Sequence, residues 1–155
     1  MTAMRHGSTL FLKIVIYLMG AAVLGLLLVV IPLAIPQAGP YAPILIGMYI
    51  PALPFFFGLY QGLKLLSYID ANTAFSERSI TALHTIKYCA AAISLMYLIG
   101  APYIYHVADL DDAPGVVLID LVLIGAPLVI AVFAAVLEQL LQNAIDIKSE
   151  NDLTV

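Results

Sequence analysis

Charged side chains are scarce in this chain. Only 10% of its 155 residues are Asp, Glu, Lys or Arg, whereas 63% are hydrophobic, and the mean hydropathy is +1.06. A water-soluble domain of this length could not cover so much apolar surface with polar side chains. The composition therefore excludes an ordinary soluble protein and predicts an integral membrane protein whose solvent is lipid.

Cysteine, basic clusters and catalytic motifs are also scarce or missing. The single cysteine, Cys89, has neither a disulfide partner nor metal-ligand spacing, so we expect a small buried hydrophobe there. No run of Lys or Arg indicates direct nucleic acid binding, and the net charge is only -4. The sequence contains no nucleophile elbow, zinc-protease motif or phosphate-binding loop. These absences predict a protein that is not an enzyme and that holds no cofactor or metal.

Three titratable residues are expected to have no special role. His6 and His84 are isolated from acidic residues along the sequence. Glu138 lies where the fourth apolar stretch ends, and no neighbour in the sequence is suited to pair with it as an acid or base. His6 and His84 are therefore interpreted as bystanders, and Glu138 is given no catalytic role.

Four apolar stretches are long enough to cross a hydrocarbon core of roughly 30 Å at about 1.5 Å per residue. Arg5 and Lys13 precede the first, so a cleaved secretory signal is the rival interpretation. That stretch is longer than the roughly 7–15 apolar residues of a signal, and no convincing cleavage site follows it. The predicted fold is all-α, a single-domain four-helix membrane bundle with spans at 14–36, 41–63, 88–105 and 116–137.

The six basic residues all fall on one side of this layout. The two loops on the other side, near 36–41 and 107–115, contain no Lys or Arg. The positive-inside rule makes the basic side cytoplasmic. Both termini, the linker 64–87 and the tail 138–155 are therefore predicted to lie in the cytoplasm of a bacterial plasma membrane.

The linker contains the signature of a helix start. Ser76 can cap the free backbone N–H groups, and the carboxylate of Glu77 favours the positive end of the helix. Phe75 can pack onto Ile80 and fix the entry of the chain. The third helix is therefore expected to begin about two turns before the bilayer. Its apolar face either packs against the bundle or binds a soluble partner, and comprises Ile80, Leu83 and Ile86.

Prolines stand inside the second and fourth spans. Pro51, Pro54 and Pro127 each remove a backbone donor, so a kink is expected at each position. Such kinks are either purely structural or line a substrate site, as in transporters. A shift of 76 residues aligns Pro51 with Pro127 and Asp70 with Asp146, which leaves a two-plus-two repeat open.

Gly58 and Gly62 form a G-x-x-x-G pair in the second span. This spacing lets two helix backbones approach closely. The partner helix belongs either to the same chain or to a second copy in a homo-oligomer, and the motif does not distinguish the two.

Acidic residues gather at the non-basic side. Oxygen ligands with one imidazole suit a divalent cation, and an ionisable residue within a span is a functional candidate by default. The alternative is a solvated loop, because Pro114 and Gly115 follow at once. The cluster comprises His106, Asp109, Asp111 and Asp112, with Asp120 inside the fourth span.

The end of the chain carries the most specific pattern. An amphipathic helix is predicted to leave the bilayer after the fourth span, followed by Asn-Asp-Leu-Thr-Val at 151–155. This ending, the Ile-Asp and Ala-Phe-Ser pieces after the second span and the four-span layout resemble the YoaS-like family of small bacterial membrane proteins of unknown function. The resemblance covers nearly the whole chain. That family usually has a glycine in the turn after Ile-Asp, where this chain has Ala-Asn-Thr-Ala at 71–74.

The resemblance implies a binding partner and no established reaction. In their typical gene neighbourhoods, members look like partners of small helix-turn-helix transcription regulators. The protein is therefore expected to be a non-enzymatic membrane regulator that binds such a regulator through its linker and tail. The final residues, 152–155, either add a strand to a partner's sheet edge or occupy a groove, or the tail folds back onto the protein's own inner loops. The alternative function is a small transporter or ion-binding subunit that uses Asp120. The expected contact residues are Asp70, Phe75, Ser76, Asn151, Asp152, Leu153, Thr154 and Val155.

Overall fold

The computed structural model describes residues 2–153, with the side chains of residues 9–151 and 153. Within this part of the chain every regular element is a helix, and four helical stretches are long and apolar enough to cross a membrane. The predicted all-α membrane fold is confirmed. The elements are α1 (Thr2–Gly25), the π-helix η1 (Leu26–Val30), α2 (Ile31–Ala34), the 3₁₀ turns η2 (Ile35–Gln37) and η3 (Gly39–Tyr41), α3 (Ala42–Gly47), α4 (Tyr49–Asp70), α5 (Glu77–Leu110) and α6 (Pro114–Leu153).

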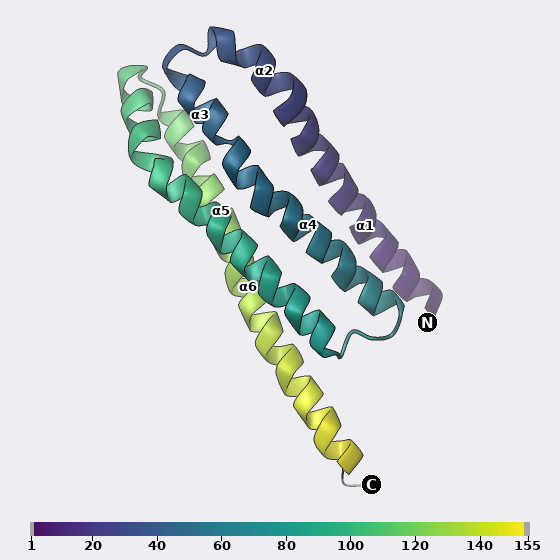
Figure 1. The fold of residues 1–155 in the computed structure, drawn as a ribbon. Coiled ribbons are helices and arrows are strands. Elements are labelled where there is room, and N and C mark those ends of the chain that lie inside the picture. Colours follow the sequence, from purple (N-terminus) through teal and green to yellow (C-terminus); the bar gives the residue numbers. More distant parts are fainter. Residues whose placement is uncertain (1, 154–155) are drawn as a thin grey trace.

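The long helices pack in the order in which they occur in the sequence. The main contacts run from α1 to α4, from α4 to α5 and from α5 to α6 (Figure 1). The start of α1, the linker between α4 and α5 and the end of α6 lie toward one end of the molecule. The connections from α2 to α3 and from α5 to α6 lie at the opposite end. Each chain reversal therefore occurs where the sequence predicts a loop.

Small side chains fill the contacts between helices, whereas large apolar side chains point outward. Ala82, Ala108 and Ala134 are buried, while Leu53 and Leu33 are among many large apolar residues that are exposed. In lipid, burial of apolar surface gives helices no drive to associate, so close packing of small residues takes its place. The exposed leucines, isoleucines and valines form the surface that contacts the bilayer.

Short-range signals set the ends of α4 and α5. The hydroxyl of Ser76 accepts a hydrogen bond from the backbone N–H of Ser79, as the predicted helix start requires. At the end of α4, Asn72 has a φ of 60°, and the N–H of Thr73 donates to the carbonyl of Tyr68 at 2.8 Å. This closing turn favours glycine, and asparagine is the usual substitute. Asn72 therefore supplies the conformation that the resemblance leads one to expect from a glycine.

Prolines disturb the first two spans more than the fourth. The second span is interrupted at Met48, between α3 and α4. In an unbroken helix the N–H of residue 51 would donate to the carbonyl of Gly47, but Pro51 has no N–H. Pro54 and Pro127 lie inside helices that continue without interruption. The interruption in the first span, η1, was not predicted from the sequence.

Pro32 accounts for the π-helical turn. At the end of η1 the N–H of Ile31 donates to the carbonyl of Leu26, five residues back. The same π-helical pattern would require an N–H at position 32 to donate to the carbonyl of Leu27. Proline has no N–H to give, and the hydroxyl of Tyr49 in α4 donates to the Leu27 carbonyl in its place. The same contact brings η1 and α2 against α4 around the buried side chains of Leu27, Ile31 and Ala52.

The G-x-x-x-G pair packs helices of this chain. A Cβ on Gly58 would lie 3.4 Å from the Cβ of Cys89 in α5, and one on Gly62 would lie 3.4 Å from Cδ1 of Ile16 in α1. Of the two interpretations of this motif, the intramolecular one is thus realised. Cys89 is buried, as predicted.

Candidate functional site

Two interhelical ion-pair clusters lie where the start of α1, the linker and the start of α5 meet their neighbours. We call this end of the molecule the ion-paired end, and define it by Lys13, Asp70, His84, Lys87 and Glu138. In the first cluster Nζ of Lys13 lies 2.6 Å from Oδ2 of Asp70. The hydroxyl of Thr9, one turn before Lys13, donates to Oδ1 of the same carboxylate. The last residue of α4 is thereby held against α1.

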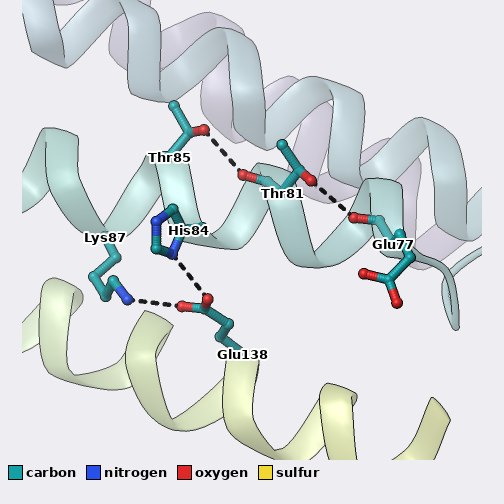
Figure 2. A network of polar contacts seen from close by, with 6 residues as sticks. All are labelled: Glu77, Thr81, His84, Thr85, Lys87 and Glu138. Carbon is teal, nitrogen blue, oxygen red and sulfur yellow. Dashed lines mark hydrogen bonds and ion pairs between the residues drawn. The ribbon is translucent and has the colours of Figure 1, made fainter. Parts of the chain in front are cut away.

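The second cluster joins α5 to α6. Figure 2 shows His84 and Lys87 directed at the two carboxylate oxygens of Glu138. Nδ1 of His84 lies 2.9 Å from Oε1, and Nζ of Lys87 lies 2.9 Å from Oε2. His84 and Lys87 share a helix face because they are three residues apart. His84, Lys87 and Glu138 all lie close to the predicted membrane boundary.

The interpretation of His84 as isolated from acidic residues is wrong, since it lies against Glu138. His84 and Glu138 are 54 positions apart, so their proximity arises only when α5 and α6 pack against each other. No local spacing rule detects such a pair. The third residue of that set, His6, lies where side chains are outside the described part of the structure.

Aromatic rings and threonine hydroxyls complete this face of α5. The ring of Tyr88 stacks edge-on against His84 with centroids 4.7 Å apart, and Nζ of Lys87 lies 5.2 Å from the Tyr88 centroid. Thr81 and Thr85 donate to backbone carbonyls one turn earlier, as Figure 2 also shows. His84, Lys87 and Glu138 thus hold α5 against α6, whereas the two threonine hydroxyls are bound to carbonyls of their own helix.

The predicted contact residues in the linker divide into structural and exposed ones. Asp70 is bound by Lys13 and Thr9, and the hydroxyl of Ser76 donates to the Thr73 carbonyl at 2.6 Å while it caps α5. Phe75, in contrast, is 60% exposed. Of these linker residues, Phe75 is therefore the one whose side chain is available to a partner.

The tail is helical as far as the structure describes it. α6 continues to Leu153 and projects past the other long helices (Figure 1). The chain contains no glycine or proline after Pro127, and hydrogen bonds from Gln139 to Asn143 and from Gln142 to Asp146 span one turn each. Residues 143–153 therefore do not fold back onto the inner loops. The strand or groove contact expected of 152–155 stays a prediction, because most of that segment lies outside the described part of the structure.

Asn151 and Leu153 belong to this helical projection. The side chain of Asp152 and the residues Thr154 and Val155 lie outside the described part of the structure. Leu153 is 83% exposed, and Ile147, six residues earlier in the same helix, is also largely exposed. The end of α6 thus presents apolar side chains to its surroundings beyond the packed helices.

The opposite end of the molecule carries the acidic residues. Asp111 accepts a hydrogen bond from the hydroxyl of Tyr41 at 3.0 Å, and the hydroxyl of Tyr103 donates to the carbonyl of Pro40 at 2.8 Å. His106 and Asp109 are exposed. Among the described residues, no group of three or more His, Cys, Asp or Glu side chains is placed to hold a metal ion. Of the two interpretations of these acidic residues, the described part of the chain therefore does not assemble the cation site.

Asp120 is the exception to this solvent-exposed pattern. It lies in α6 with only 6% of its surface exposed, and its Oδ1 has no hydrogen-bond partner within the described residues. Tyr97 in α5 is near enough to interact with it electrostatically. One turn further along α6, the hydroxyl of Ser94 donates to the carbonyl of Ile124 at 2.7 Å. The carboxyl group thus stands in a small polar strip between α5 and α6.

Comparison with known proteins gives a consistent but functionally open result. A model of the family described as "Protein of unknown function (DUF2975)" matches residues 32–155. The chain is 51% identical to the uncharacterized membrane protein YoaS of Bacillus subtilis (strain 168) over 160 residues, which cover 98% of this chain and 100% of that protein. No solved structure gives a significant match.

Proposed function

We propose that this chain, which belongs to the DUF2975 family, is a non-enzymatic regulator in the bacterial plasma membrane that binds a small cytoplasmic helix-turn-helix transcription regulator. The observation that carries the proposal is the end of α6, which projects past the packed helices as a continuous helix. A projection of this kind has no role in packing the spans. It is suited to binding another protein.

The orientation follows from the charges. Lys13 and Lys87 belong to the ion-paired end, Lys64 stands in the same helix as Asp70 and six residues before it, and the opposite loops at 36–41 and 107–115 contain no basic residue. Under the positive-inside rule the ion-paired end faces the cytoplasm. The projection of α6 then reaches the compartment in which transcription regulators occur.

The chemistry of the projection suits a DNA-binding partner. After Glu138, which is bound by His84 and Lys87, the chain has three acidic residues and a single basic residue, Lys148. An acidic helix complements the basic surface by which a regulator binds DNA, and so competes with that DNA. The exposed Ile147 and Leu153 add apolar contacts of the kind that a helix presents to a groove. The membrane protein would thereby hold its regulator away from DNA.

A crosslinking pull-down from native membranes tests this proposal. The full chain is expected to recover a small soluble helix-turn-helix protein, and the chain lacking Ser149–Val155 is expected to lose it while still inserting into the membrane. Asp109→Asn, at the opposite end of α5, is the matched control and should recover the regulator normally. If the deletion leaves both recovery and the regulator's location unchanged, the proposal fails.

Asp120 supports a second candidate, a small proton- or cation-conducting subunit. A buried carboxyl group within a span is costly unless it has a function, and such residues often mark ion pathways. In proteoliposomes, the wild-type protein should then pass protons or monovalent cations, and Asp120→Asn should abolish the flux. Proteoliposomes of the wild-type protein that pass neither ion would rule this function out.

A further inference from the structure

A cavity of about 330 Å³ lies between the broken second span and α5. One wall is formed by residues 43–51, across the junction of α3 and α4, and the other by residues 96–104 of α5. We call it the apolar groove. It lies in the half of the molecule away from the ion-paired end, so it is separate from the surface proposed to bind a regulator.

Two features of the backbone create the groove. The interruption at Met48 separates α3 from α4. Pro51 has no N–H that could continue the helical hydrogen bonds across this interruption. Gly47 lines one wall and Gly100 the other, and a Cβ built on either would meet no atom within 4 Å. The absence of side chains at both positions therefore leaves open space beside the groove.

The lining of the groove excludes most kinds of occupant. In the described part of the chain, none of its lining residues is charged, and the hydroxyl of Tyr103 already donates to the Pro40 carbonyl. Water needs two to four polar partners and would find few here. Its volume is at the lower limit of about 300 Å³ for ligand pockets. A transmembrane helix, about 10–12 Å wide, is too thick for it.

The groove is continuous with the surface that contacts the bilayer. Ile50 on one rim is 58% exposed and Ile99 on the other is 71% exposed. The material beyond these rims is the hydrocarbon of the membrane, since both residues lie within spans. A single flexible hydrocarbon tail can enter from that side without leaving an apolar environment.

We propose that the apolar groove binds one acyl chain of a bilayer phospholipid and retains it longer than the lipids around the rest of the protein. Bound there, the chain packs against Met48 and Met96, whose flexible thioethers adapt to an irregular partner. The lipid fills the gap between α4 and α5 that the two glycines leave open. It thereby acts as a structural part of the folded protein in the membrane.

Photolabelling in vesicles tests the proposal. The intact protein is placed in phosphatidylcholine vesicles that contain a lipid with a diazirine group on its acyl chain, and labelled peptides are mapped after illumination. Labelling should concentrate on residues 43–51 and 96–104. Gly100→Leu should remove that concentration, because the new side chain occupies the space of the acyl chain. Gly47→Leu, on the opposite wall, should have the same effect.

A matched glycine provides the control. Gly125 in α6 also has no atom within 4 Å of a built Cβ but does not line the groove. Gly125→Leu should therefore keep the labelling pattern of the wild type. The proposal is overturned if labelling is uniform over the lipid-facing surface, if Gly100→Leu leaves it unchanged, or if the groove crosslinks to a second copy of the chain.

Discussion

Individual charged residues near the membrane boundary are paired across helices. Lys13 binds Asp70, and Lys87 binds Glu138 together with His84. In each case the two partners come from consecutive long helices, so the pairs fix the relative position of neighbours. A partly buried charge is costly without a partner, which explains why these charged residues occur in sets.

Loss of Glu138 should destabilise the contact between α5 and α6. Glu138→Gln leaves the partly buried ammonium of Lys87 without its counter-charge, and we expect a loss of about 1–2 kcal/mol, between the values for exposed and buried pairs. Thermal unfolding in mild detergent, followed by circular dichroism, measures the change. Asp109→Asn alters an exposed carboxylate of α5 and should have no such effect. Equal stability of wild type and Glu138→Gln would contradict the importance of this cluster.

Local signals were visible in the sequence, whereas partners brought together by packing were not. Ser76 stands directly before an acidic residue and an apolar face, and it caps α5 as predicted. The pairing of His84 with Glu138 depends on how α5 and α6 cross, and nothing within a few residues of either position encodes it. The same holds for Tyr49, whose contact with Leu27 could be expected only after the π-helical turn was known.

At the scale of elements, the contact between the first span and α4 depends on Pro32, because this proline leaves the carbonyl of Leu27 in η1 without a helical donor. Tyr49→Phe should cost about 1–2 kcal/mol, because the Leu27 carbonyl then has no donor. In a Pro32→Ala background the new N–H can supply the missing bond, so the same substitution should cost less. A double-mutant cycle of detergent unfolding measures this difference. Equal costs in both backgrounds would disprove the role given to Pro32.

The position of α4 between α1 and α5 depends on small residues. Gly58→Leu would place three further carbons beyond a Cβ that already lies 3.4 Å from Cys89, so α4 and α5 must separate. Overpacking of this kind typically costs about 1–3 kcal/mol. Unfolding in detergent should show that loss for Gly58→Leu and little change for Gly125→Leu, whose Cβ meets no atom within 4 Å. Similar stability of the two variants would refute the close approach at Gly58.

The whole molecule is a row of helices in chain order with an asymmetric distribution of charge and length. The sequence predicted its class and its four spans, because runs of apolar residues longer than the bilayer are unambiguous. It did not predict that α6 continues as a helix to Leu153, because the polar end with its β-prone residues indicated a separate tail. The helical hydrogen-bonding pattern prevails there in the absence of any glycine or proline.

Which end of this row faces the cytoplasm decides where a partner can bind. The central claim is that the ion-paired end and the projection of α6 are cytoplasmic. Single cysteines introduced into a Cys89→Ala background can be probed with a membrane-impermeant maleimide on intact and permeabilised cells. Ala38→Cys and Asp109→Cys should be labelled on intact cells, and Ala74→Cys and Ser149→Cys only after permeabilisation. The reverse pattern would contradict the orientation and, with it, the proposed regulator.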